Sequence, residues 1–131
     1  MKEKITTNTH EAKEFFLKIN SFLTGPYELH EMIKEKIDDI NIIDVRTYDD
    51  YIDGHIPFAI HIPINHIDDH LVMLHKDKIN VVYCYNQYCK LGPKAAYYIA
   101  DKGYPVMLLE GGYHIWQKYG YDTIRSSSSE N

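Results

Sequence analysis

The chain has 131 residues, 44% of them hydrophobic and 25% charged, which is the size and composition of one globular domain with a single core. Its formal net charge is −5 and it has no basic stripe, which argues against nucleic acid as the main ligand, because phosphate neutralisation needs clustered Lys and Arg. No apolar stretch is long enough to span a bilayer, and no apolar run follows the charged N-terminus. We therefore expect a cytoplasmic protein with no membrane partner.

Three regions are expected along the chain. Residues 1–21 are predicted to be an N-terminal extension, in which residues 11–20 form a helix with one apolar side. Residues 22–124 are expected to form the domain itself. Residues 125–131 are polar and are predicted to be a disordered tail.

Short apolar runs predict the strands of the domain. Short runs rich in apolar residues are typical of strands that are buried on both faces, as in a parallel sheet. They are found at residues 42–45, 60–62, 81–83 and 106–109.

Amphipathic stretches between these runs predict helices, which are expected at residues 26–36, 65–75, 93–102 and 112–119. Gly25 and Pro26 suit the cap and the first turn of the first helix, and Gly103 suits the position after the third. An alternation of strands and helices implies right-handed crossovers, with helices on both faces of the sheet. The predicted fold class is therefore α/β.

A cysteine stands where the ligand of such a fold is expected. Cys84 directly follows the run at residues 81–83 and precedes a loop that leads into the helix predicted at residues 93–102. Ligands of open parallel sheets bind beyond the carboxyl ends of the strands, and amides at the start of a helix attract anions. These amides would lower the pKa of the Cys84 thiol and make it a nucleophile. The alternative is a small apolar residue at a strand end, and position alone leaves both interpretations open.

Several motifs occur in a consistent order between about residue 22 and residue 124. They are Ile43-Asp44-Val45-Arg46, Asp50-Tyr51, Gly54-His55-Ile56-Pro57, Val82-Tyr83-Cys84, Ala95-Ala96, Gly103-Tyr104, Gly111-Gly112, Trp116 and Gly120-Tyr121. Each motif is weak alone, but the ordered set resembles the rhodanese-like domain family, a family of sulfurtransferases. The resemblance implies a five-stranded parallel sheet flanked by helices on both faces.

The resemblance also implies a chemistry for Cys84. This residue would be the catalytic nucleophile of a thiosulfate or persulfide sulfurtransferase and would carry sulfane sulfur as a persulfide. The donor would be thiosulfate or a small persulfide, and the acceptor would be cyanide, a small thiol or a protein thiol, with no cofactor and no metal. Asp44 and Arg46 would brace the structure near the site. The substrate-binding loop would comprise Tyr85, Asn86, Gln87, Tyr88 and Lys90.

The loop after Cys84 departs from the common pattern of the family. It has neither the glycine nor the arginine that usually follow the cysteine, and Phe58 replaces a second glycine further upstream. Without an arginine the loop lacks a planar fork that grips phosphate with two parallel hydrogen bonds, and Lys90 or Lys94 would supply only a charge. Phosphatase activity, which relatives of this fold have, is therefore a minor alternative.

The loop also contains a second cysteine, Cys89, as in a less common subgroup of the family. In a reducing compartment two cysteines this close are more often catalytic, redox-active or metal-binding than a structural disulfide. Cys89 is either a resolving thiol, which attacks a Cys84 persulfide or closes a disulfide with Cys84, or a half-buried residue with a packing role. Two alternatives to the sulfurtransferase stay open: a Cys84/Cys89 thiol-disulfide reductase and a catalytically inactive rhodanese-like binding module.

A pair of histidines raises the question of a metal. His66 and His70 are four residues apart and would share one side of a helix. A catalytic zinc site needs a third protein ligand and an open position, and no pattern in the sequence places a third ligand. We therefore expect a solvated helix face here and no metal site.

Overall fold

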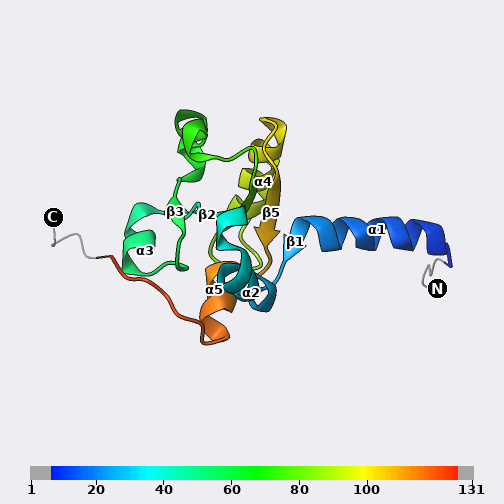
Figure 1. Ribbon diagram of the computed structural model, residues 1–131, viewed down its shortest axis with the longest axis horizontal. Coiled ribbons are helices and arrows are strands. Elements are labelled where there is room, and N and C mark those ends of the chain that lie inside the picture. The colour runs from blue at the N-terminus through cyan, green and yellow to red at the C-terminus, as the bar shows by residue number, and fades with distance from the viewer. Residues whose placement is uncertain (1–6, 127–131) are drawn as a thin grey trace.

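The computed structural model describes residues 7–126, and its centre is a parallel sheet of five strands. In spatial order the strands are β1 (Leu23–Thr24), β5 (Val106–Leu109), β4 (Ile79–Tyr83), β2 (Ile40–Asp44) and β3 (Ile60–His61). Each neighbouring pair is parallel, and helices pack on both faces (Figure 1). The predicted α/β fold class is confirmed.

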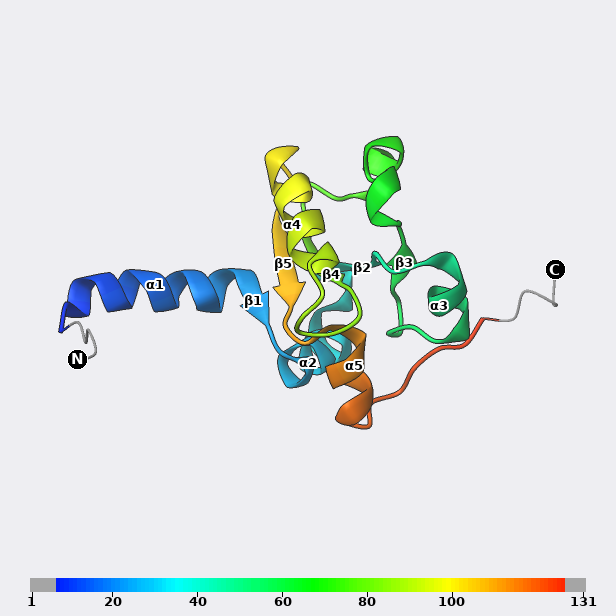
Figure 2. The same ribbon diagram turned by 180° about the vertical axis from the view of Figure 1, so that it is seen from behind.

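Helices cover the two faces of the sheet, as the opposite views of Figures 1 and 2 show. Helices α2 (Pro26–Lys36) and α5 (Gly112–Lys118) pack on one face, and α4 (Leu91–Asp101) packs on the other. Neighbouring strand residues alternate between the faces, so that Val81 joins one buried cluster and Val82 the other. Both faces of β4 are therefore buried, which explains its uninterrupted apolar run.

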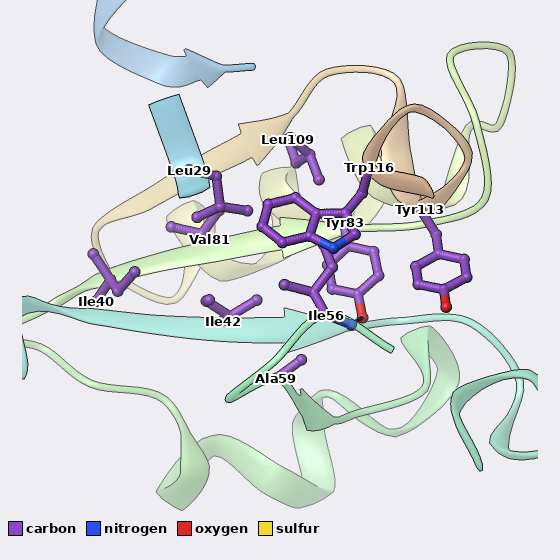
Figure 3. Close-up of a cluster of buried hydrophobic side chains, with 10 residues drawn as sticks. All are labelled: Leu29, Ile40, Ile42, Ile56, Ala59, Val81, Tyr83, Leu109, Tyr113 and Trp116. Atoms are coloured by element: carbon purple, nitrogen blue, oxygen red, sulfur yellow. Dashed lines mark hydrogen bonds between the residues drawn. The ribbon is translucent and has the colours of Figure 1, made fainter. Parts of the chain in front are cut away.

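The cluster under α2 and α5 is built around aromatic side chains (Figure 3). Trp116 of α5 is 1% exposed, and its indole Nε1 donates to the carbonyl oxygen of Asp122, 2.9 Å away. Tyr83 of β4 and Leu29 of α2 belong to the same cluster. Full burial of one large apolar side chain contributes roughly 1.5–3 kcal/mol. This packing fixes α5 against the carboxyl end of β4, where the candidate nucleophile follows.

The connection between β3 and β4 differs from the prediction. It forms two short 3₁₀ helices, η2 (Ile64–His66) and η3 (Asp68–Met73), in place of the α-helix expected at residues 65–75. Non-helical dihedral angles at His70 (φ −126°, ψ 27°) interrupt the second one. Core-facing side chains recur here at intervals of three, four and three residues, and the three-residue steps suit the three residues per turn of a 3₁₀ helix. These side chains are Ile64, Ile67, Leu71 and Leu74.

Most other boundaries differ from the prediction by one or two residues. Helix α2 has the predicted bounds, whereas α4 begins two residues early, at Leu91, and includes Pro93 in its first turn. Proline is tolerated there because the first amides of a helix have no intrahelical partner. The sequence did not predict α3 (Tyr48–Asp53), η1 (Ile37–Asp39) or the bounds of the two-residue strand β1.

Helix α1 (Thr9–Phe22) extends two residues beyond the predicted helix at each end. It projects away from the sheet in both ribbon views (Figures 1 and 2). None of its residues is buried, and the side chains of its apolar side, such as Phe15 and Phe16, are more than half exposed. Within residues 7–126, no helix is both long enough and apolar enough to cross a membrane.

The predicted tail begins at residue 125, and its residues 127–131 lie outside the described residues, as do residues 1–6 at the other end of the chain. The first two tail residues contact α3. Arg125 Nη2 donates to Asp53 Oδ1 at 3.1 Å, and the amide of Ser126 donates to the carbonyl oxygen of Ile52 at 2.9 Å. The chain is therefore held against α3 as far as residue 126.

Candidate active site

Cys84 follows the last residue of β4, a central strand that pairs with both β2 and β5. Its side chain is 3% exposed and belongs to the cluster that contains Val82 and Ala95. Residues 85–90, which we call the cysteine loop, lead from it into α4. The thiol therefore lies where the sequence predicted it, beyond the carboxyl end of a strand and at the amino end of a helix.

Two backbone hydrogen bonds tie the start of the cysteine loop to α5. The amide of Tyr113 donates to the carbonyl oxygen of Cys84 at 2.8 Å, and the amide of His114 donates to that of Tyr85 at 2.9 Å. This close approach requires glycine at residue 112, where φ is +60° and a Cβ would lie 2.6 Å from the carbonyl oxygen of Cys84. Gly112 therefore positions the backbone of the cysteine.

The sulfur of Cys84 faces backbone amides. Those of Tyr85 and Gly92 act to lower the pKa of the Cys84 thiol, and Gly92 lies in the first turn of α4. Gly92 has no room for a side chain, because a Cβ there would lie 3.2 Å from Cys84 Sγ and 2.8 Å from Leu108 Cδ1. The loop and helix amides that the sequence predicted around the thiol are therefore in place.

Cys89 shares this setting. Its thiol is half-buried, the interaction of the two thiols shifts both pKa values, and both cysteines are free. The Cys84 thiol also donates to the carbonyl oxygen of Cys89, with Sγ 3.7 Å from the oxygen. The amides of Tyr85, Leu91 and Gly92 reach the sulfur of Cys89 as well. The two sulfurs therefore lie side by side in one cradle of amides.

The two thiols differ in acidity, and the order is the reverse of the expected one. Burial and the hydrogen bond with Cys89 raise the pKa of Cys84 to about 11, although the amides of Tyr85 and Gly92 act against them. Burial raises the pKa of Cys89 less than the hydrogen bond from Cys84 and the amides lower it, so the pKa of Cys89 falls. The prediction of a lowered pKa for Cys84 is therefore wrong for the free protein, because the amides do not offset the desolvation of a buried thiolate. The directions of the two shifts make Cys89 the more acidic thiol of the pair.

A buried ion pair stands at the carboxyl end of β2. Arg46 Nη2 lies 2.8 Å from Asp44 Oδ2, and the two side chains are 4% and 0% exposed. The hydroxyl of Tyr83 donates to the same carboxylate oxygen at 2.7 Å, and Arg46 also donates to the carbonyl oxygen of Gly54. The guanidinium carbon lies 4.1 Å from the ring centroid of Tyr113. Asp44, Arg46 and Tyr83, which we call the brace, thus join β2, β4 and α5 beside the cysteine, in the position expected for a bracing role.

Tyr85 ties the cysteine loop to α3. Its hydroxyl donates to Asp50 Oδ2 at 2.6 Å and accepts a hydrogen bond from the amide of Thr47 at 3.2 Å. The hydrogen bond from Tyr85 is the largest cause of the lowered pKa of Asp50, followed by the one from the hydroxyl of Thr47. The Tyr85 hydroxyl is therefore engaged within the protein, and this residue holds the start of the loop.

Comparison with known proteins places the chain in a family. Residues 25–119 match the family described as Rhodanese-like domain. The chain belongs to the rhodanese-like domain family. Over 93 residues it is 30% identical to the thiosulfate sulfurtransferase GlpE of Coxiella burnetii, which covers 70% of this chain and 83% of that protein. The family identified from the ordered motifs is therefore confirmed, and its type is that of sulfurtransferases.

Two further proteins are similar to the chain. The HTH-type transcriptional regulator Rv0324 of Mycobacterium tuberculosis is 38% identical over 82 residues, which are 63% of this chain but only 36% of that regulator. The crystal structure of protein BH2092 from Bacillus halodurans superposes with a TM-score of 0.86 at 34% identity, and the match covers 91% of this chain and 88% of that one.

A hollow of about 280 Å³ adjoins the cysteine loop of this rhodanese-like domain. Asn86, Gln87 and Tyr88 line one side, and His114 and Lys118 of α5 line the other. Sequence reasoning missed the two α5 residues, and the available signal was the glycine pair before them, which brings the start of α5 against the loop. Neither cysteine lines the hollow, which therefore lies beside the cysteine loop and not at the thiols.

The two lysines at the start of α4 have different surroundings. Lys90 is exposed at the N-cap of the helix. Lys94 lines a separate hollow of about 400 Å³ together with Ile64 and Tyr98. Lys90 is therefore the lysine that the cysteine loop itself offers to an anion.

No group of three or more His, Cys, Asp or Glu side chains within residues 7–126 could hold a metal ion. His66 and His70 are both paired inside the chain. His66 Nδ1 lies 3.6 Å from Asp69 Oδ2, and His70 Nδ1 lies 2.8 Å from the carbonyl oxygen of His66. The two histidines thus form local contacts on the 3₁₀ segment.

Proposed function

We propose that this domain is a thiosulfate or persulfide sulfurtransferase in which Cys84 carries sulfane sulfur as a persulfide. The proposal rests on the position of Cys84, whose sulfur lies at the end of β4 against the amides of Tyr85 and Gly92. An anionic persulfide on this sulfur would be stabilised by these amides and by the amino end of α4. Relatives named as sulfurtransferases support the reaction class.

The donor approaches from the open side of the cysteine loop. Asn86, Gln87, Tyr88 and Lys90 are exposed there. Thiosulfate carries two negative charges, so the ammonium group of Lys90 favours its approach, and the amide groups of Asn86 and Gln87 can donate to its oxygens. We therefore assign the oxygen-bearing end of the donor to these residues, and its outer sulfur to the thiol of Cys84.

The first half-reaction begins with the loss of a proton, because the nucleophile is the thiolate. In the free pair Cys84 holds its proton and donates it in a hydrogen bond to the carbonyl oxygen of Cys89, and the neighbouring Cys89 sulfur, the more acidic of the two, is a nearby base that can take it up. The Cys84 thiolate then attacks the outer sulfur of thiosulfate. A new S–S bond forms on Cys84, the S–S bond of the donor breaks, and sulfite leaves with the bonding electron pair. The product is the anionic persulfide of Cys84.

The second half-reaction removes the outer sulfur. Cyanide attacks this sulfur, leaves as thiocyanate and returns Cys84 as a thiolate. A small or protein thiolate attacks in the same way and becomes a persulfide. Atoms and charge balance in both half-reactions without a cofactor.

Intact-protein mass spectrometry shortly after addition of thiosulfate or glutathione persulfide tests the proposal. Wild type and Cys89→Ser should each gain one sulfur atom, whereas Cys84→Ser should gain none, because a serine oxygen cannot form the persulfide. Circular dichroism of Cys84→Ser checks that the variant is folded. A Cys84→Ser protein that still gains sulfur, beside a Cys89→Ser protein that does not, would mean that Cys89 is the carrier.

Phosphate esters provide a second test of the reaction class. The cysteine loop has no arginine to hold a phosphoryl group with two parallel hydrogen bonds. Hydrolysis of an aryl phosphate should therefore stay at the background rate in a colorimetric assay. Turnover that is well above background in wild type and absent in Cys84→Ser would favour a phosphatase.

A further inference from the structure

The proposed sulfur transfer consumes one thiol, and the site contains two. Cys89 lies beside Cys84 in the same cradle, is more exposed, and exchanges a hydrogen bond with it. A cysteine with only a packing role would be expected to bury its thiol among apolar atoms, away from amides. Cys89 packs against the buried cluster that contains Cys84, but the amides of Leu91 and Gly92 in the first turn of α4 also act on its thiol and lower its pKa.

We propose that Cys89 is a resolving thiol, which attacks the inner sulfur of the Cys84 persulfide, closes a Cys84–Cys89 disulfide and releases hydrosulfide. This inference rests on the proposed function, because it needs the persulfide on Cys84. It adds a second activity to the site: the domain reduces the sulfane sulfur of thiosulfate or a small persulfide to sulfide. The outer sulfur of the persulfide then need not be passed to an external acceptor.

The step balances in atoms and charge. The reactants are the anionic persulfide of Cys84 and the thiol of Cys89, and the products are one disulfide and one hydrosulfide ion. The bond between the two sulfurs of the persulfide breaks, a bond between the Cys84 and Cys89 sulfurs forms, and the Cys89 proton leaves with the hydrosulfide. The two cysteines are oxidised by two electrons and the outer sulfur is reduced by two. A dithiol, or two molecules of a small thiol, must then reduce the disulfide before the next cycle.

The fold of the cysteine loop brings the second thiol back to the first. The amide of Cys89 donates to the carbonyl oxygen of Asn86 at 3.2 Å, and the amide of Tyr88 donates to Asn86 Oδ1 at 2.9 Å. These bonds close a tight turn, and the chain beyond it returns to the sulfur of Cys84. The backbone of Cys89 is thus held against the sulfur of Cys84, and a thiol attached to it has a large advantage over a thiol in solution.

The amide cradle suits the leaving group as well as the nucleophile. The amides of Tyr85 and Gly92 reach both sulfurs, so negative charge can move between them without leaving the cradle. The lowered pKa of Cys89 raises its thiolate fraction above that of an ordinary thiol, and thiolate fraction and access are among the factors that set the rate of exchange. Hydrosulfide is small enough to leave past the exposed residues of the loop.

The test follows the fate of one loaded sulfur. Wild type, Cys89→Ser and Cys89→Ala are each treated with one equivalent of glutathione persulfide and freed of small molecules. Persulfide is then followed by intact mass, sulfide by a fluorescent alkylating probe, and the disulfide by peptide mapping. Wild type should release one sulfide per loaded sulfur and gain the Cys84–Cys89 peptide. Both variants should keep the persulfide at least about tenfold longer, since exchange then lacks a neighbouring thiol.

The outcomes separate this inference from the proposed function. A wild type that loads sulfur and keeps it as long as the variants do, with no disulfide peptide, overturns the resolving role and leaves the sulfurtransferase intact. A protein that never loads sulfur, with or without Cys89, overturns both. Because the sulfide and the disulfide peptide are measured in wild type, the test does not depend on the folding of either variant.

Discussion

The brace and the cysteine loop meet at one site but are held in opposite ways. The brace is buried, and its charged groups are fully hydrogen-bonded; within residues 7–126 no buried side-chain nitrogen or oxygen lacks a partner. Residues 86–88 of the cysteine loop are exposed, and the turn is closed through Asn86. The conformation of the brace is thus fixed by burial, and that of the cysteine loop by a few local hydrogen bonds.

This difference separates stability from chemistry. Buried charges are tolerated only with complete partners, so any loss in the brace leaves an uncompensated charge. The cysteine loop must admit a donor and an acceptor, and exposed polar residues leave it open to them. Substitutions in the brace should therefore change folding, whereas substitutions in the cysteine loop, such as those at Cys89, should change reactivity with little effect on folding.

The largest effect is expected in the brace. Arg46→Ala leaves the carboxylate of Asp44 buried without its cation, and it should lower the free energy of unfolding by about 3–5 kcal/mol. Urea denaturation measures this loss in the free energy of unfolding. The matched control is Arg125→Ala, because Arg125 pairs with Asp53 on the surface, with side chains 78% and 74% exposed. This control should change stability by less than about 1 kcal/mol. Equal losses in the two variants would contradict the claim that the buried ion pair matters more for stability than the surface ion pair.

Two glycine substitutions test whether the close approach of α5 positions Cys84. Gly112→Ala places a Cβ 2.6 Å from the carbonyl oxygen of Cys84, at a residue whose φ is +60°. Gly103→Ala also has positive φ, +90°, but its Cβ meets no atom within 4 Å. Both should lose roughly 1–2 kcal/mol from the left-handed backbone. Only Gly112→Ala should lose more than this and also load sulfur more slowly, because its clash displaces Cys84. Equal loading rates in the two variants would show that the approach of α5 does not position the thiol.

The sequence predicted the sheet well because strands buried on both faces leave continuous apolar runs. Ile42 and Ile43 face opposite clusters, and both must be apolar. The two residues of β1 are too few for any such pattern. The 3₁₀ segment was taken for an α-helix because apolar residues three and four apart suit both periods, and only the dihedral angles at His70 separate them.

The site was less predictable than the fold. Cys84 was found because a strand end followed by a loop and a helix is a local pattern. The reversed acidity was not found, because it depends on the burial of Cys84 and on its contact with Cys89. The attachment of Tyr85 to Asp50 joins residues far apart in the chain and has no local signal. Chemistry-bearing residues were thus predictable, but their charge states and partners were set by tertiary contacts.

The acidity of the two thiols gives a test within the loop. At neutral pH the raised pKa keeps Cys84 protonated, so its alkylation by iodoacetamide should become fast only as the pH rises towards 11. Cys89 should react at a lower pH than an ordinary thiol, because its pKa is lowered. Peptide mass spectrometry across a pH series separates the two rates. In Cys89→Ala the partner that raises the pKa of Cys84 is gone, and the Cys84 curve should move to lower pH. A wild-type Cys84 that reacts at lower pH than Cys89 would reverse this order.

The smallest effect is expected where the cysteine loop is tied to α3. Tyr85→Phe removes the hydrogen bond to Asp50 and should lower the free energy of unfolding by about 1 kcal/mol at neutral pH, since Asp50 is accessible to solvent. The pKa of Asp50 is lowered in the folded protein, and the bond from Tyr85 is the main cause. Its contribution is therefore present above the pKa that the carboxyl group has in the unfolded chain, and it is lost as the pH falls through the folded value. Urea denaturation at neutral and acidic pH should show the difference in unfolding free energy between wild type and Tyr85→Phe closing as the solution is acidified.

In Arg46→Ala, where the lost partner is a buried cation, the loss of unfolding free energy at neutral pH should be several times larger than in Tyr85→Phe. A gap for Tyr85→Phe that matches the one for Arg46→Ala would mean that the loop is held as firmly as the brace.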